Sequence, residues 1–398
     1  MLKTYVRDPD LRIVGEVRGW TRLEVRLAWL GVGSWLLEGP AMGLVEQLAQ
    51  PGYGLVVVDP RGVPLMSPDD VLISGDVEDN GPRVWSADSN DDAYPGTLTI
   101  TGGDDFAIIA DELAFPDPAR AVTSQSAAYD KRSGPAETVI KGYVAANVGT
   151  SRAAARGDAA APGVRTVTVA PSQGRGSHVS YSARFDPMID VVRHCAQTST
   201  PPLGVRVQQN GPGLLFDVYV PQDRSGEVVF SRSRRNLRGY SVQRSMPTAT
   251  HVVVGGGGEG AARVIRERKD SAAAAEWRRI IRVFVDQRHT TDTTELDAAG
   301  DEELMRNRRS GALSATAVDT PNMRFGRHFG LGDLVTVELE PGVRIVDRVT
   351  AATIVCTDEG LQPVELQIGN PDVDPQLPES YRRASMALDQ IAALARRV

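Results

Sequence analysis

Seven short apolar runs occupy the first hundred residues and recur at spacings of about ten positions. Short runs separated by turn residues are typical of strands in an antiparallel barrel or sandwich. Between the runs, Met42, Leu44, Val45 and Leu48 follow helical spacing, which predicts a short helix over residues 40–50. The expected strands are residues 11–17, 22–30, 33–38, 54–59, 71–77, 83–86 and 97–101. We therefore expect an N-terminal β-barrel domain over residues 1–103.

The composition agrees with many turns between strands, because 39 glycines and 25 prolines occur among 398 residues. The 41% hydrophobic and 24% charged fractions exclude a wholly disordered chain, a collagen or a coiled-coil rod. A net charge of −7 argues against general affinity for nucleic acid or an anionic membrane. We recognise no secretion signal and no apolar stretch of the ~18 residues that a membrane span needs, so we expect no stable membrane insertion.

Helical spacing returns in the middle of the chain and predicts a mixed α+β domain over residues 104–235. Its expected helices are residues 104–115, 135–148 and 186–198, and a linker rich in Ala, Arg and Gly is expected over residues 149–163. A hairpin is expected from residues 204–209 and 214–220 through the turn Asn210-Gly-Pro-Gly213.

Strand patterns return after residue 236 and predict a second barrel domain, residues 236–370, with a helical insertion. The expected strands are residues 251–254, 263–268, 280–287, 334–339, 343–353 and 363–368, and the expected helix of the insertion is residues 297–309. A polar helix over residues 378–396 is expected within a C-terminal helical tail, residues 371–398.

The glycines Gly255, Gly257 and Gly260 match the pattern G-x-G-x-x-G after an apolar run. Asp286 ends a later run, about where a dinucleotide-binding fold places its ribose-binding acid. A long strand-rich segment precedes the match and no βαβ series follows, so we favour a glycine hairpin between two strands over an NAD site.

The other candidate ligands lack the spacing that their chemistry needs. Asp88–Asp92 resembles the start of a calcium loop, but Ala93 and Thr99 stand where Gly and Glu are required. The histidines do not have zinc spacing, and the two cysteines have no partner at redox or zinc spacing, so both cysteines are expected to be buried small residues. The acids could hide a glycosidase pair, although a solvated loop face is the default expectation. These residues are His178, His194, His251, His289 and His328; Cys195 and Cys356; and Asp69, Asp70, Asp76, Glu78, Asp79, Asp104 and Asp105.

Four arginines, Arg232, Arg234, Arg235 and Arg238, form a basic cluster in the sequence FSRSRRNLRG. Guanidinium groups bind phosphate or carboxylate equally well. The cluster has no interleaved aromatic residue and the chain is net negative, so we expect it to face acidic groups of a neighbouring chain rather than nucleic acid.

Taken in order, several segments resemble the minor tail proteins that form the tail hub of long-tailed, siphovirus-type actinobacteriophages. The resemblance covers roughly residues 5 to 370. The segments that carry it are Ile73-Ser-Gly75, TLTITGGDDFAIIADELAFPDP, the run from Tyr129 to Thr138 with KGYVAANVG, YSARFDPMIDVVRHCA, LLFDVYVPQDRSGEVVFSRSRRNL, THVVVGGGGEGAAR and FGRHFGLGDLVTVEL.

Such hubs are similar to the baseplate hubs of contractile phages. The resemblance implies a β-rich α+β multidomain fold with two tail-tube-like antiparallel β-barrels around a mixed α/β middle region, and a homotrimer that forms a pseudo-hexameric ring. The implied partners are the tail tube and distal tail proteins, the tape measure protein and other tail tip proteins, with DNA passing transiently through the lumen.

We therefore expect a structural virion protein at the tail tip, assembled in the host cytoplasm, that joins the tail tube to the tip and lines part of the DNA ejection channel. We expect no enzyme activity, no catalytic, cofactor-binding or metal-binding residue, and no cofactor. Little chain follows residue 370, which makes a receptor-binding or lytic extension in this chain less expected. The alternatives are a tail-associated peptidoglycan hydrolase and an NAD-binding oxidoreductase.

Overall fold

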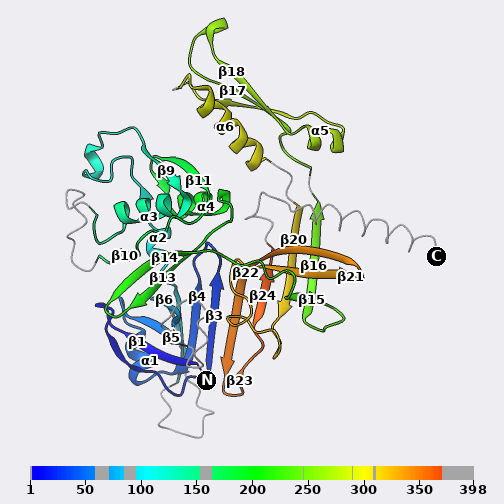
Figure 1. Cartoon of the computed structure of the whole chain (residues 1–398). Helices are drawn as coiled ribbons and strands as arrows, with labels where there is room; N and C mark the ends of the chain where they lie inside the picture. The colour runs from blue at the N-terminus through cyan, green and yellow to red at the C-terminus, as the bar shows by residue number, and fades with distance from the viewer. Residues whose placement is uncertain are drawn as a thin grey trace. The chain divides into compact units, whose positions relative to one another are not determined.

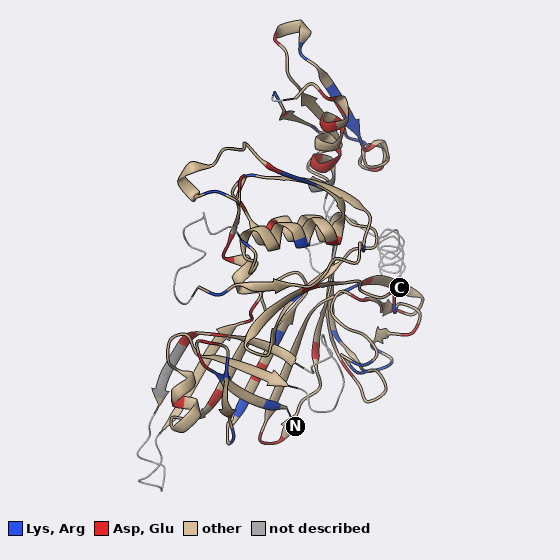
Figure 2. Cartoon of the chain, turned by 60° about the vertical axis from the view of Figure 1, so that its left-hand side comes forward, with Lys and Arg blue, Asp and Glu red and all other residues tan. Residues whose placement is uncertain are grey.

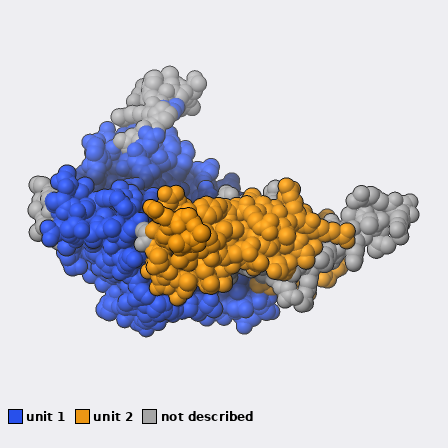
Figure 3. All heavy atoms as spheres, turned by 90° about the horizontal axis from the view of Figure 1, so that it is seen from above, with its two compact units in different colours: residues 1–228, 317–335, 348–367 blue, residues 229–316, 336–347, 368–398 orange. Residues whose placement is uncertain are grey.

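The computed structural model describes residues 2–58, 71–84, 96–152, 164–244, 246–288, 290–307 and 311–369. The chain divides into two compact units, each built from several stretches of sequence (Figure 3). Unit 1 comprises residues 1–228, 317–335 and 348–367, and unit 2 comprises residues 229–316, 336–347 and 368–398. Of the linker expected over residues 149–163, residues 153–163 lie outside the described residues, as does the expected helix over residues 378–396.

Antiparallel strands dominate the first hundred residues, as expected. Within unit 1 the strand order is β22-β3-β4-β7-β6-β5-β1-β2, and no pairing among the described residues closes it into a barrel. The β-rich fold is confirmed, whereas closure into two barrels stays a prediction. The elements are β1 (Lys3–Arg7), β2 (Ile13–Glu16), β3 (Arg22–Ala28), β4 (Ser34–Pro40), α1 (Gly43–Leu48), β5 (Gly54–Val58), β6 (Val71–Val84), β7 (Thr97–Gly103), β22 (Val343–Thr357) and β23 (Gly360–Leu361).

Alternation along the strands explains which face of this sheet is buried. In β3, the side chains of Leu23, Val25 and Leu27 are buried while the intervening residues are more exposed. This period of two places every second side chain on the same face. Trp35 and Leu37 of β4 continue the same core.

The middle region of unit 1 mixes helices and strands (Figure 1). The expected hairpin of β13 and β14 is confirmed, with Asn210 opposite Gly213 at its turn. Helix α3 buries the expected stripe, including Val139, Ile140 and Val144, and packs against α4. The elements are α2 (Ala107–Ala110), β8 (Leu113–Ala114), β9 (Asp130–Pro135), α3 (Ala136–Asn147), β10 (Val167–Val169), β11 (His178–Ala183), β12 (Asp186–Pro187), α4 (Met188–Thr198), β13 (Gly204–Asn210) and β14 (Gly213–Tyr219).

The expected helix over residues 104–115 is wrong in its length. Only Ala107–Ala110 is helical, and Leu113–Ala114 forms β8, which pairs with β12. The backbone of Leu113 pairs with Pro187, a residue far along the chain, so tertiary pairing overrides the helical pattern.

Unit 2 contains a three-stranded sheet in the order β18-β17-β19, with α6 packed on one face. Val252, Val254 and Leu296 form the centre of its small core. Figure 2 shows acidic residues on the helix next to basic residues on a strand, and here Arg266 of β18 pairs with Asp297 of α6 and Arg268 with Asp301. The remaining elements of the chain are β15 (Val229–Ser231), β16 (Leu237–Arg244), β17 (His251–Gly255), β18 (Ile265–Lys269), α5 (Ser271–Trp277), β19 (Arg282–Asp286), α6 (Thr293–Arg306), β20 (Gly311–Val318), β21 (Leu334–Glu340) and β24 (Glu365–Ile368).

Candidate functional site

A bend in strand β6 positions the most extensive polar network described in unit 1. The first part of β6 pairs with β5 and the second part pairs with β7, and the change of partner falls between Asp76 and Val77. A Cβ added at Gly75 would overlap the carbonyl oxygen of Gly103, and one added at Gly102 would overlap that of Asp76. The glycines of the ISG and TGG segments therefore permit the close backbone approach that this bend requires.

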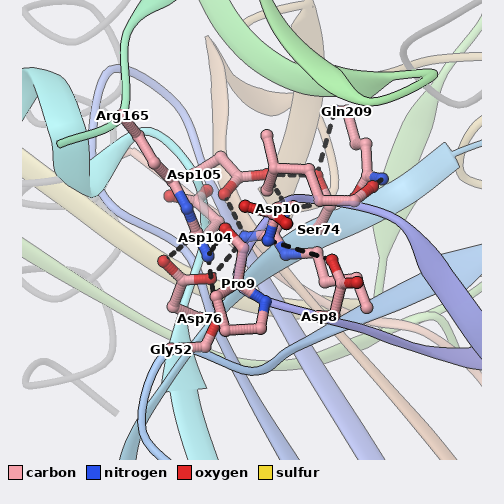
Figure 4. A network of polar contacts seen from close by, with 12 residues as sticks. Asp8, Pro9, Asp10, Gly52, Ser74, Asp76, Asp104, Asp105, Arg165 and Gln209 are labelled. Carbon is pink, nitrogen blue, oxygen red and sulfur yellow. Dashed lines mark hydrogen bonds and ion pairs between the residues drawn. The ribbon is translucent and has the colours of Figure 1, made fainter. Parts of the chain in front are cut away.

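Arg7, at the end of β1, has a fully buried side chain. Its partners Asp76, Asp105 and Gln209 are labelled in Figure 4. The Nη1 and Nη2 atoms of Arg7 donate to the two carboxylate oxygens of Asp105 at 2.8 and 2.5 Å. Nη2 also donates to Asp76 Oδ1 at 2.7 Å, and Nη1 donates to Gln209 Oε1 at 3.1 Å. The planar guanidinium fork matches the carboxylate, which makes this arrangement a strong charge-assisted pair.

Other polar groups connect the network to further segments. The hydroxyl of Ser74 donates to Asp105 Oδ2 at 2.5 Å and accepts the backbone N–H of Gln209 at 3.1 Å. Arg165 pairs with Asp76 and donates to the carbonyl oxygen of Gly52 at 2.9 Å. The network thus ties together β1, β6, the start of α2, the end of β13 and the segment before β10.

The protonation of two groups in this region is perturbed. Burial alone would lower the pKa of Arg7, but the charges and hydrogen bonds of Asp105 and Asp76 outweigh it and raise the pKa. Burial raises the pKa of Asp104 to about 7, helped by the charges of Asp105 and Glu78 and opposed by backbone N–H donors. The Asp104 carboxyl group therefore keeps its proton to a higher pH than an ordinary aspartate does.

The expectation of a solvated loop face is wrong for Asp105, whose side chain is only 3% exposed. Asp105 and Asp76 are bound by one guanidinium, and Asp105 also accepts a hydroxyl proton. The arrangement therefore holds segments of the chain together. Asp69 and Asp70 lie outside the described residues.

A second buried ionic cluster lies in the middle region and was not expected from the sequence. Lys141 of α3 donates to Glu137 at 2.8 Å, to Asp217 at 2.9 Å and to the carbonyl oxygen of Pro171 at 3.0 Å. Burial by itself would raise the pKa of Glu137, but Lys141 and backbone donors lower it overall. The i, i+4 spacing of Glu137 and Lys141 within an apolar stripe was the available signal.

The glycine-rich motif forms the expected hairpin. β17 and β18 pair antiparallel, with Gly255 opposite Ile265. The N–H of Gly256 donates to Val264 O at 2.8 Å, and that of Gly257 donates to Thr290 O at 2.7 Å. These two donors are therefore unavailable to a phosphate group, which a dinucleotide site would bind through such N–H groups.

Asp286 is likewise occupied. Its carboxylate pairs with Arg263 and with Arg288, the latter at 2.7 Å. Burial by itself would raise the pKa of Asp286, but the two arginines lower it overall. The residue holds the hairpin to its neighbouring strand.

The remaining sequence candidates do not converge. The segment Asp88–Asp92 and His289 lie outside the described residues. Cys195 and Cys356 are both buried, as expected, and burial raises the pKa of Cys195 to about 12. Within the described part of the chain, no group of three His, Cys, Asp or Glu side chains could hold a metal ion, and no helix there is long and apolar enough to cross a membrane.

One serine–histidine contact is of interest for the hydrolase alternative. Ser133 Oγ lies 3.2 Å from His178 Nε2, and the hydroxyl of Ser180 donates to Ser133 Oγ at 2.9 Å. These side chains lie on the exposed face of the β9–β11 ribbon. Nucleophilic catalysis also needs oxyanion donors and a base held in position, and an exposed ribbon face does not enclose a reacting group.

The four arginines of the basic cluster are all exposed, on and beside the turn between β15 and β16. Arg232 lies 3.6 Å from Glu340 of the same chain. The prediction that the cluster faces a neighbouring chain is not tested by these contacts.

Comparison with known proteins gives the family and the fold. The family model of the Siphovirus ReqiPepy6 Gp37-like protein matches residues 3–370. No curated protein matches the chain by sequence. The 43 kDa tail protein of prophage MuSo2 from Shewanella oneidensis is similar at a TM-score of 0.54 and 13% identity, covering 94% of this chain and 99% of that one. A tail protein from Neisseria meningitidis MC58 gives a TM-score of 0.53 and 14% identity, covering 94% and 98%. The chain therefore belongs to the Siphovirus ReqiPepy6 Gp37-like family.

Proposed function

We propose that the protein is the tail hub: a homotrimeric ring that joins the tail tube to the tail tip and forms part of the DNA ejection channel. The observation that carries the proposal is the family match over residues 3–370, which spans both compact units. The likeness to two tail proteins over nearly their full length supports the same assignment at the level of the fold.

In this proposal the domains at residues 1–103 and 236–370 each contribute a tube-like β-barrel, the domain at residues 104–235 lies between them, and residues 371–398 form a tail. Three copies then contribute six similar β-rich domains, which match the six-fold symmetry of the tail tube. The ring as a whole has three-fold symmetry on the side that faces the tip. A cyclic arrangement suits strand-rich subunits because it pairs or covers open sheet edges.

The charge of the chain is compatible with a DNA channel. A strongly basic lumen would bind the passing phosphates and slow ejection, whereas a net charge of −7 gives no such general attraction. The proposed partners are the tail tube and distal tail proteins, the tape measure protein and other tail tip proteins. The proposed location is the tail tip of the virion, after assembly in the host cytoplasm.

The test is negative-stain electron microscopy of the purified protein, alone and mixed with purified tail tube protein. We expect three-fold rings with an open centre, built from 42.8 kDa subunits. Single subunits under both conditions would overturn the ring. Immunogold labelling of intact virions tests the location separately, and label along the tail shaft or on the capsid would contradict it.

We further propose that the chain is structural and carries no enzyme activity. Zymography of the purified protein on actinobacterial cell walls tests this proposal. The Ser133→Ala variant is the matched control, because the Ser133 hydroxyl contacts His178 on an exposed face. No clearing is expected from either protein. Clearing by the unaltered protein would overturn the proposal.

A further inference from the structure

The turn between β15 and β16 presents four arginines in unit 2. We name residues 231–238, which carry Arg232, Arg234, Arg235 and Arg238, the arginine turn. All four side chains are exposed. Only Arg232 has an acidic partner among the described residues, and the contact is long, at 3.6 Å to Glu340. Arg234, Arg235 and Arg238 form no ion pair in the part of the chain that the structure describes.

Two buried side chains hold the backbone of the arginine turn. Asn236 Oδ1 accepts the N–H of Ser231 at 2.8 Å, and Asn236 Nδ2 donates to Val229 O at 3.2 Å. Ser231 Oγ accepts the N–H of Arg234 at 3.2 Å, and the N–H of Arg235 donates to Arg232 O at 3.0 Å. The arginines are therefore displayed from a preorganised backbone, which reduces the ordering cost of a contact.

Arg235 also has a left-handed backbone, with φ of 57°. A long side chain rarely occupies this region, and the conformation costs free energy that glycine or asparagine would avoid. Within the described chain, the guanidinium of Arg235 forms no ion pair or hydrogen bond that would offset this cost.

From these observations we propose that the arginine turn docks onto carboxylate groups of a second copy of this chain. The proposal rests on the proposed homotrimer and names the surface that one subunit uses. Charge complementarity supports a second copy as the partner, because the chain is net acidic at −7. The chain also displays carboxylates that form no ion pair among the described residues, such as the adjacent and exposed Asp358 and Glu359 between β22 and β23.

Carboxylate is favoured over nucleic acid phosphate by the surroundings of the turn. Phe230, which directly precedes the turn, is fully buried, and Tyr240, which follows it, is partly buried and donates its hydroxyl to Glu340 at 3.4 Å. Neither residue presents an exposed ring on which a base could stack.

The experiment compares the unaltered protein with Arg234→Glu/Arg235→Glu by sedimentation velocity over a range of protein and salt concentrations. The matched control is Arg278→Glu/Arg279→Glu, which makes the same charge change at two adjacent exposed arginines without an ion pair in the described chain. Arg278 also has a left-handed backbone, with φ of 51°. Thermal melting of all three proteins establishes that the substitutions leave the fold intact.

We expect the dissociation constant of self-association to rise at least tenfold in Arg234→Glu/Arg235→Glu and to stay within about twofold in the control. Association of the unaltered protein should also weaken as salt is raised. Equal association of all three proteins as trimers would overturn the arginine turn as the contact while leaving the homotrimer standing. If the unaltered protein stays monomeric at every concentration, both alone and mixed with tail tube protein, both the arginine turn as the contact and the homotrimer are overturned.

Fluorescence anisotropy with a labelled DNA duplex provides the last arm. Binding to DNA that the Arg234→Glu/Arg235→Glu variant loses and the control keeps would overturn the carboxylate partner in favour of phosphate. No binding by any of the three proteins supports the proposal.

Discussion

Replacing Arg7 by methionine should destabilise unit 1 strongly, because it leaves a buried carboxylate without its counter-ion. Asp105 would keep the hydroxyl of Ser74 but lose two short charge-assisted hydrogen bonds. Removing one partner of a buried ion pair costs about 3–5 kcal/mol. That is a large part of the ~5–15 kcal/mol that stabilises a typical native protein.

The assay is urea unfolding followed by tryptophan fluorescence, since Trp29 and Trp35 are buried in unit 1. If the free energy of unfolding decreases by about 3 kcal/mol per molar urea, the urea concentration at the midpoint of unfolding should fall by more than about 1 M. Arg18→Met is the control, because Arg18 pairs with Glu16 on the surface and its side chain is 83% exposed. The control should unfold like the unaltered protein.

A double-mutant cycle separates the ion pair from the loss of packing around Arg7. Asp105→Asn removes the buried charge, so Arg7→Met/Asp105→Asn should be less destabilised than the sum of the two single variants. Additive effects, or an Arg7→Met midpoint equal to that of Arg18→Met, would refute the reasoning that the network holds this part of the fold together.

Two further perturbations test Asp104 and the glycine hairpin. The pKa of Asp104 is raised to about 7 from 3.8, so the folded state favours the protonated carboxyl, and stability present below pH 4 is lost as pH rises through 7. The melting temperature of Asp104→Asn minus that of the unaltered protein should therefore increase as the pH is raised from 5 to 8. A difference that stays constant over this range would contradict the raised pKa of Asp104. In the hairpin, a Cβ at Gly256 would lie 2.7 Å from Leu296 Cδ1, so Gly256→Ala should lower the melting temperature. A Cβ at Gly260 would meet no atom within 4 Å, so Gly260→Ala tests only the cost of placing alanine at a φ of 55°. Calorimetric titration of the unaltered protein with NAD should show no heat, and saturable binding would contradict the structural reading of the glycines.

Local patterns predicted the elements whose contacts lie close along the chain. The β13–β14 hairpin and the β17–β18 hairpin pair residues within a few positions of their turns, so alternation and turn chemistry suffice to locate them. Helix α3 follows its apolar stripe because burial of one face determines it.

The same patterns failed where a distant strand competes with a local preference. Residues 111–115 follow a helical period, yet Leu113 pairs with Pro187 of β12. A strand of two residues leaves too little sequence to be distinguished from the end of a helix.

The sequence by itself determined that the chain is β-rich, that its glycine motif is a hairpin and that its segments resemble phage tail proteins, because these properties depend on periodicity, turn residues and the order of short motifs. Only the tertiary structure decided the polar network around Arg7. Arg7 is 98 positions from Asp105 and 202 from Gln209, and no local pattern relates residues at such separations. A charge is stable in the interior only when the fold brings partners to it. Because these partners are distant in sequence, the sequence analysis predicted a solvated surface position for Asp105, whereas the folded chain buries it.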